Sequence, residues 1–274
     1  MFMGRKYWVM LVCAGGMIVG LVLSAGGFSP GVAQGDDFRI ETTVFFGAIQ
    51  RPSSSNVTLF HGGVVYDFMS DPEKVAVFDV GQERFILLDP ARKIKTVIPT
   101  KQLTAYADRI RSWAGRQEGE FFQFVAQPNF EQRFDESTGD LMMASPHMTY
   151  HIKTTAASSD SVMQQYQAFS DWYARLNSAT NVGALPPFAR LAVNKALADK
   201  RRIPRQVEVT INPPKSTGRK PITIRSEHRV QGRLVESDKK RIDQVANQLH
   251  CFKEVALAEF VAAAEEDRRQ AAAK

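Results

Sequence analysis

Apolar and polar side chains alternate along the chain from Phe38 to Ile98. A period of two residues is typical of a β-strand with one buried face, because successive side chains point to opposite sides of a sheet. Turn-forming clusters, such as Gly62-Gly63 and the stretch 70–73, interrupt the alternation. The pattern predicts an antiparallel meander with strands at 38–46, 57–69 (one or two strands), 75–80, 85–89 and 94–98.

After Pro99 the apolar residues recur every three or four positions, which is typical of amphipathic helices. Thr100 is placed to cap the first of these helices, and we expect it to end near Gly115. Both periods then occur in turn along the rest of the chain. They predict strands at 121–125, 130–134, 141–144, 147–154, 207–212 and 222–230, and helices at 158–176, 188–195 and 237–260.

This order of strands and helices predicts an α+β fold. In it, an antiparallel β-meander or incomplete barrel has its apolar face covered by amphipathic helices. We expect a single domain at residues 34–261, since single β-rich domains reach about 250 residues. Residues 262–274 are predicted to be a solvated C-terminal tail.

Residues 1–33 have the layout of a secretion signal. Arg5 and Lys6 precede an uncharged apolar run, and the small residues 31–33 stand directly before a polar stretch. The run from Tyr7 to Phe28 is also long enough to span a membrane, so a cleaved signal peptide and an uncleaved anchor both fit. In either case the positive flank stays inside. The sequence therefore predicts an exported body, periplasmic or anchored to the inner membrane and facing the periplasm.

The segment 74–96, KVAVFDVGQERFILLDPARKIKT, resembles the LolA-like lipoprotein-carrier superfamily. It joins one strand through a turn to an aromatic-aliphatic strand that runs into Asp89-Pro90, and a basic residue and a further strand follow. The resemblance covers residues 38–98. It implies a LolA-like incomplete barrel wrapped around helices, whose interior takes up lipid chains, and a lipid or a lipoprotein as partner. The chain departs from a minimal carrier by its greater helical content after Ser158.

Positive charge is concentrated in the last third of the chain. Residues 185–253 carry 16 Lys and Arg against 6 Asp and Glu, whereas the whole chain has a net charge of +6. This stretch suits an anionic membrane surface, or it is an ordinary solvated face. Candidates for contacts with an anionic headgroup are Arg190, Arg201, Arg202, Arg225 and Arg229. Export makes nucleic acid and cytosolic cofactors poor partners, so we expect no cofactor and no nucleic-acid binding; the oligomeric state stays open.

The sequence assigns no catalytic residue and no metal site. Its five histidines lack the spacing of a helical zinc site, and Cys-x-x-Cys does not occur. Ser226 and His228 face inward on a predicted strand, either as a catalytic pair or as hydrogen-bonded core side chains. We favour the second interpretation, because no carboxylate on that face orients the imidazole. Cys251 lies in a helical pattern and is expected to be a small buried hydrophobe.

Aromatic side chains provide the best candidate ligand site. A pocket between the sheet and the helices would be lined by Phe60, Tyr66, Phe68, Tyr166, Trp172, Tyr173 and His228, although the same residues can simply fill a core. The sequence thus predicts an exported, non-catalytic binding protein of the bacterial envelope, which holds an apolar or lipid-like ligand or an envelope partner. The alternatives are a membrane-anchored envelope sensor or scaffold domain and a periplasmic hydrolase.

Overall fold

The structure is a computed structural model, and it describes residues 35–272 except 48, 50, 182, 214–217 and 219. Residues 1–33, for which the sequence predicts a signal peptide or an anchor, lie outside the described residues. The chain from Gln34 to Lys274 forms one compact unit. Within the described residues, no helix combines the length and the apolar character that crossing a membrane requires.

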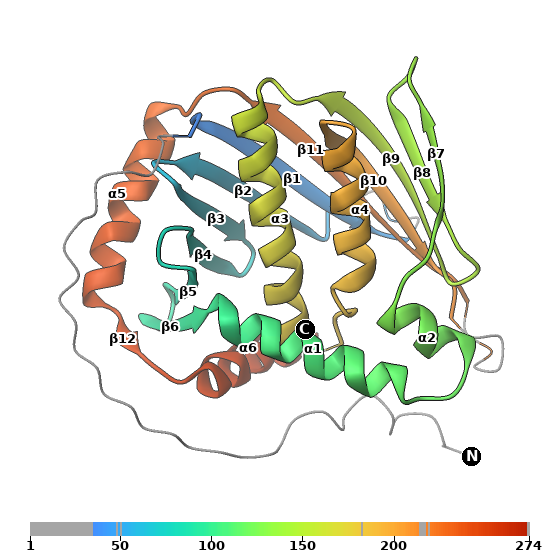
Figure 1. The fold of residues 1–274 in the computed structure, drawn as a ribbon. Coiled ribbons are helices and arrows are strands. Elements are labelled where there is room, and N and C mark those ends of the chain that lie inside the picture. The colour runs from blue at the N-terminus through green and yellow to red at the C-terminus, as the bar shows by residue number, and fades with distance from the viewer. Residues whose placement is uncertain are drawn as a thin grey trace. The chain divides into compact units, whose positions relative to one another are not determined.

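The described chain begins with a run of strands and then mixes strands with helices (Figure 1). The strands are β1 (Phe38–Phe46), β2 (Ser54–His61), β3 (Val64–Ser70), β4 (Glu73–Asp79), β5 (Arg84–Asp89), β6 (Ile94–Pro99), β7 (Glu131–Asp135), β8 (Asp140–Ala144), β9 (Met148–Ala156), β10 (Arg202–Ile211), β11 (Ile222–Gln231) and β12 (Lys253–Glu254). The helices are α1 (Thr100–Gly115), α2 (Glu120–Ala126), α3 (Asp160–Thr180), α4 (Phe188–Asp199), α5 (Glu236–Cys251) and α6 (Leu257–Ala272).

The twelve described strands form one open sheet in the order β12-β6-β5-β4-β3-β2-β1-β11-β10-β9-β8-β7. Neighbouring strands are antiparallel, except that β12 runs parallel to β6. The first strand lies near the middle of the sheet, where Arg39 pairs with Gln231 of β11. The prediction of an α+β fold with an antiparallel sheet is confirmed, and the open sheet is compatible with an incomplete barrel.

We call the face of the sheet that α3 and α4 cover the inner face (Figure 1). Strands β1 to β6 pack against α1, α3 and α6 through a first inner cluster of apolar side chains, and strands β8 to β10 pack against α4 through a second. The first inner cluster includes Phe38, Phe60, Phe85, Tyr166 and Phe169. The second includes Tyr150, Ile152, Val193, Leu197 and Val207.

Helix α5 packs on the opposite, outer face of the sheet. Its Val245 is buried in an outer cluster with Leu59 of β2, Phe68 of β3 and Leu88 of β5. The strands in this part of the sheet therefore bury apolar residues on both faces. On β9, by contrast, the outward side chains of His151 and Lys153 are exposed, so the outer face near β9 is polar and open.

The segment predicted as a strand at 121–125 is instead helix α2, and that prediction is wrong. In a strand, Phe121 and Phe122 would point to opposite faces. In the helical turn, Phe122 packs edge-on against Trp113 at 5.6 Å between ring centroids, and Phe121 against His147 at 5.6 Å. Tertiary packing of these aromatic rings therefore outweighs the preference of the short apolar run for a strand.

The single helix predicted at 237–260 is also wrong, because β12 separates α5 from α6. Phe252 packs in the outer cluster, whereas Val255 and Phe260 are buried in the first inner cluster. One straight helix cannot reach both faces of a sheet, so the chain crosses its edge. It does so in extended form: the Lys253 N–H donates to Lys93 O at 3.1 Å and the Val255 N–H to Lys95 O at 2.8 Å. These bonds satisfy backbone groups that an edge strand leaves open.

Two further expectations concern the end of the chain. Cys251, expected to be buried, is exposed, because it occupies the last turn of α5 on the side away from the sheet. Helix α6 continues to Ala272, through most of the segment predicted as a tail.

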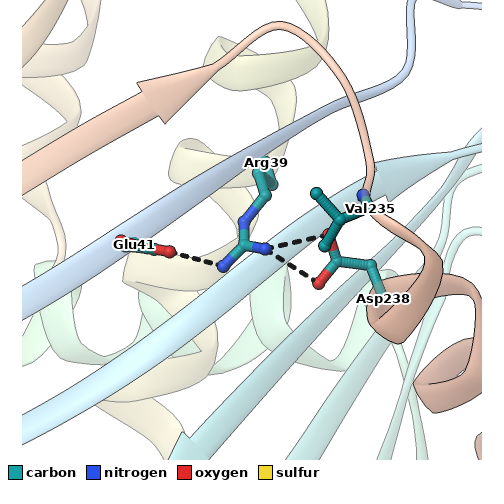
Figure 2. A network of polar contacts seen from close by, with 4 residues as sticks. All are labelled: Arg39, Glu41, Val235 and Asp238. Atoms are coloured by element: carbon teal, nitrogen blue, oxygen red, sulfur yellow. Dashed lines mark hydrogen bonds and ion pairs between the residues drawn. The ribbon is translucent and has the colours of Figure 1, made fainter.

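A buried ion pair fixes the start of α5 against the middle of the sheet (Figure 2). Nη1 of Arg39 donates to both carboxylate oxygens of Asp238, at 3.1 and 3.0 Å, and Nη2 donates to Glu41 Oε1 at 2.5 Å. The side chain of Asp238 is 3% exposed. Its Oδ2 also accepts the backbone N–H of Val235 at 2.9 Å, so the same carboxylate caps the helix.

Replacing Asp238 with Asn is expected to lower the free energy of unfolding by about 3 kcal/mol, because it leaves the charge of Arg39 buried without its main partner. Urea denaturation followed by circular dichroism measures the change. Asp199→Asn is the matched control, since Asp199 pairs with Lys195 at an exposed site on α4. That variant should lose less than about 1 kcal/mol. Equal losses in the two variants would contradict the role of the buried pair.

Candidate functional site

The aromatic residues predicted to line a ligand site divide between the two faces of the sheet. Four belong to the first inner cluster: Phe60, Tyr166, Trp172 and Tyr173. Two belong to the outer cluster beneath α5: Tyr66 and Phe68. The strand pairing explains the division, because Phe60 lies opposite Val65 of β3 and the next side chain along β3 points to the other face.

The five candidate arginines are also dispersed. Arg201 is paired with Asp160, and the guanidinium of Arg202 stands 5.5 Å from the ring centre of Phe134. Arg225 and Arg229 belong to the outward positions of β11, where Arg225 is paired with Glu227. Arg190, on α4, is the candidate whose charge acts on inner-face residues: it contributes to the pKa shifts of Tyr150, Asp171 and His228.

A band of polar side chains crosses the inner face between the two inner clusters. Register places Thr42 of β1 opposite both Asn56 of β2 and His228 of β11, so these three residues form one row. Ser226 of β11 and the buried pair of Thr58 and Asp67 lie beside this row. We call the set the inner polar band: Thr42, Asn56, Thr58, Asp67, Ser226 and His228.

His228 connects two hydroxyl groups within this band. Its Nδ1 lies 3.1 Å from Thr42 Oγ1, and its Nε2 lies 2.9 Å from Ser226 Oγ. Burial lowers the pKa of His228 to about 3, and the charge of Arg190 acts in the same direction. The imidazole is therefore neutral near pH 7, with one nitrogen donating and the other accepting.

This arrangement differs from a catalytic triad in the group that orients the imidazole. Thr42 takes the place of the carboxylate, and a hydroxyl does not stabilise an imidazolium as a carboxylate does. A base whose pKa lies near 3 is also poorly matched to proton abstraction at neutral pH. The contact of Ser226 and His228 is best suited to supplying hydrogen bonds.

Asp67 supplies the carboxyl of the band, and 1% of its surface is exposed. Its Oδ1 accepts hydrogen bonds from Thr58 Oγ1 at 2.7 Å and from Asn56 Nδ2 at 2.5 Å. Oδ2 makes no hydrogen bond of ordinary geometry among the described residues, although the Tyr173 hydroxyl is close enough to act on the Asp67 carboxyl. Burial raises the pKa of Asp67, while Thr58, Asn56 and Tyr173 oppose the shift by hydrogen bonding. The charge of Asp67 in turn raises the pKa of Tyr173 on α3, and burial adds to it.

Polar groups of α3 and α4 complete the interface from the side of the helices. Nδ2 of Asn194 donates to Asp171 Oδ1 at 2.8 Å and so joins the two helices. Asn194 is 1% exposed, and its Oδ1 has no hydrogen-bond partner in the part of the chain that the structure describes. Burial raises the pKa of Asp171, against the effects of Asn194, Arg175 and Arg190. The interface between helices and sheet thus contains unfilled hydrogen-bonding capacity beside a half-buried guanidinium.

Sequence reasoning identified His228, Ser226 and Arg190 but missed Asp67 and Asn194. A signal for both was present, because each interrupts an apolar pattern. Asp67 follows Val65 at an inward position of β3, and Asn194 lies among the buried positions of α4. A polar residue at a core position is a candidate site residue because its burial is costly unless it is paired.

Among the described residues, no group of three His, Cys, Asp or Glu side chains is arranged to hold a metal ion. No family model matches the chain, and no curated protein matches it.

The free energy of unfolding is expected to fall as the pH drops from about 6.5 toward 3. The unfolded chain takes up a proton on His228 in this range, whereas the folded chain, with its lowered pKa, does not. His228→Gln should remove this contribution and flatten that part of the stability profile, as measured by urea denaturation at a series of pH values. His151→Gln, at an exposed position on β9, is the control. A His228→Gln profile with the slope of the unmodified protein would contradict the assignment.

Proposed function

We propose that the exported body is a non-catalytic binding module of the LolA-like half-barrel type, which holds an amphiphile between its sheet and the helices of the inner face. The observation that carries the proposal is the composition of this interface, where a polar band lies between two apolar clusters. An amphiphile has the same division into apolar and polar parts. An open antiparallel sheet whose inner face is covered by helices is also the architecture that the resemblance of residues 38–98 implies.

The apolar part of the ligand would lie against the first inner cluster. Tyr166 and Phe169 of α3 contact the sheet in this cluster, and the ring of Phe169 stands 5.7 Å from that of Phe60. An acyl chain that takes the place of these contacts keeps apolar surface out of water, at about 25 cal/mol per Å². Entry of the ligand would require α3 to move away from the sheet, and α4, which is joined to α3 by the Asn194–Asp171 hydrogen bond, would move with it.

The polar part of the ligand would lie on the inner polar band. Arg190 supplies the positive charge for an anionic headgroup, and the hydroxyls of Thr42 and Ser226 supply neutral hydrogen bonds. A buried acceptor without a partner costs about 1 to 3 kcal/mol. A ligand hydroxyl or a water molecule that donates to Asp67 Oδ2 or Asn194 Oδ1 removes this cost.

The place of action follows from the predicted export. The body would work in the periplasm, either free or anchored to the inner membrane, beside an anionic membrane surface. The lipids or lipoproteins of that surface would be the source of the ligand. Catalysis forms no part of this function, because the Ser226–His228 contact lacks an orienting carboxylate.

Oleate is expected to bind the purified protein, as measured by isothermal titration calorimetry below the critical micelle concentration. Arg190→Gln should weaken oleate binding about tenfold, because one charge-assisted hydrogen bond is lost. The same variant should leave the binding of monoolein, which has a neutral headgroup, unchanged.

Lys195→Gln is the matched control for this experiment, since Lys195 lies on the exposed side of the same helix. If neither amphiphile binds a protein whose circular dichroism is intact, the proposed function fails. If oleate binds equally well to the Arg190→Gln variant, the headgroup contact is wrong although the function stands.

Export has a separate test. A reporter that is active only in the periplasm, fused after Lys274, should be active, because Arg5 and Lys6 precede the apolar run. The same fusion without residues 1–33 should be inactive and is the control. Activity of a cytoplasm-only reporter in the full-length fusion would contradict export.

A further inference from the structure

Two adjoining hollows lie on the outer face of the sheet, away from α3 and α4. The first has a volume of about 560 Å³ and is lined by residues of β1, β9, β10 and β11: Glu41, Thr43, Lys153, Arg205, Gln206, Glu227, His228 and Arg229. The second, of about 630 Å³, extends over β7 and β8 and shares Lys153 and Gln206 with the first. The first hollow contains no aromatic residue of the first inner cluster, whereas the second includes Phe134, which packs against the second inner cluster.

A bulge in β10 brings an extra cation into the first hollow. The pairing of β10 with β9 shifts between Pro204 and Gln206, which leaves Arg205 unmatched. Ile203 and Val207 on either side are both buried toward the inner face. In a regular strand Arg205 would share the inner face with Ile203 and Val207, but it is exposed. The bulge turns it outward, so Arg205 and Gln206 both line the hollow although they are consecutive residues. Bulges redirect side chains in this way next to functional sites.

The charge of the first hollow is positive once its ion pairs are taken into account. Glu41 is paired with Arg39 and Glu227 with Arg225, so both carboxylates of the lining have partners outside it. The ion pairs among the described residues do not involve the three lining cations, Lys153, Arg205 and Arg229.

We propose that the first outer hollow binds a phosphate group through Arg205 and Arg229, with Lys153 at its border. Guanidinium groups present a planar fork of donors that matches the oxygens of a phosphate. Thr43 and Gln206 add neutral hydrogen-bonding groups to the same hollow. A phosphate is favoured over a carboxylate, because its tetrahedral oxygens can accept hydrogen bonds from several cations at once, and a phosphate monoester also carries about −1.5 to −2 at pH 7.

This site lies on the opposite face of the sheet from the proposed amphiphile site. His228, which is neutral, borders both sites, and they share no charged residue. The phosphate group belongs either to a soluble molecule or to a lipid headgroup, because both present the same oxygens. The hollow is open to solvent at exposed side chains, so binding should weaken as salt screens the charges.

The test uses purified full-length protein and inorganic phosphate in isothermal titration calorimetry. Saturable binding is expected. The Kd should rise about tenfold in each of the single variants Arg205→Gln and Arg229→Gln, because each loses one charge-assisted hydrogen bond. Both substitutions are at exposed positions, and circular dichroism verifies that the fold is kept.

Arg133→Gln is the matched control, because it removes one positive charge from an exposed site in the second hollow only. If the Kd of the Arg133→Gln variant rose as much as that of Arg205→Gln, the proposal would be overturned. The absence of saturable phosphate binding to the unmodified protein would also overturn it.

Vesicles of phosphatidylglycerol and of phosphatidylcholine distinguish the two sources of the phosphate. Binding to phosphatidylglycerol vesicles that inorganic phosphate displaces supports the hollow and assigns it to a headgroup. If inorganic phosphate binds and vesicles do not, the result supports the hollow as a phosphate site and assigns the phosphate to a soluble molecule. Vesicle binding that inorganic phosphate does not displace overturns the assignment to the hollow.

Discussion

The buried ion pair of Arg39 and Asp238 is the contact that decides which part of the outer face is covered by a helix and which part stays open. It joins the first strand to a helix that begins almost 200 residues later, and both charges are almost out of water. The pair holds α5 on the outer face, over the strands that are apolar on both sides. The strands on the other side of β1 keep an open outer face. Glu41 bonds Arg39 and also lines the first outer hollow, so the anchor of α5 is continuous with that hollow.

Alternation within one strand lets the two faces have different chemistry. On β11, His228 belongs to the inner polar band, where burial keeps it neutral, whereas the next residue, Arg229, lines the charged outer hollow. The two proposed sites are therefore separated only by the thickness of the sheet. A shift of the β11 register by one residue would exchange these side chains and remove both sites together.

Much of the fold was predictable from the sequence, because alternation and helical periodicity are local properties. The strands at 38–98 and helices α1, α3 and α4 depend on such patterns. The site was less accessible, since it depends on which strands pair. The sequence does not state that β1 pairs with β11, and this pairing brings Thr42 to His228. Nor does the sequence state that Tyr66 lies on the outer face of the sheet, beneath α5. Helix α2 and the break at β12 were missed for the same reason, because distant contacts determine both.

An open sheet has two edges, and this chain protects them differently. At β6 the edge is covered by β12. At β7 it carries exposed charges at Glu131, Arg133 and Asp135. If two copies joined by antiparallel pairing centred on Arg133, arginine would stand opposite arginine, and Glu131 opposite Asp135. Like charges directly opposite each other on paired strands are destabilising. In this register the uncovered edge therefore resists pairing with a second copy of the chain.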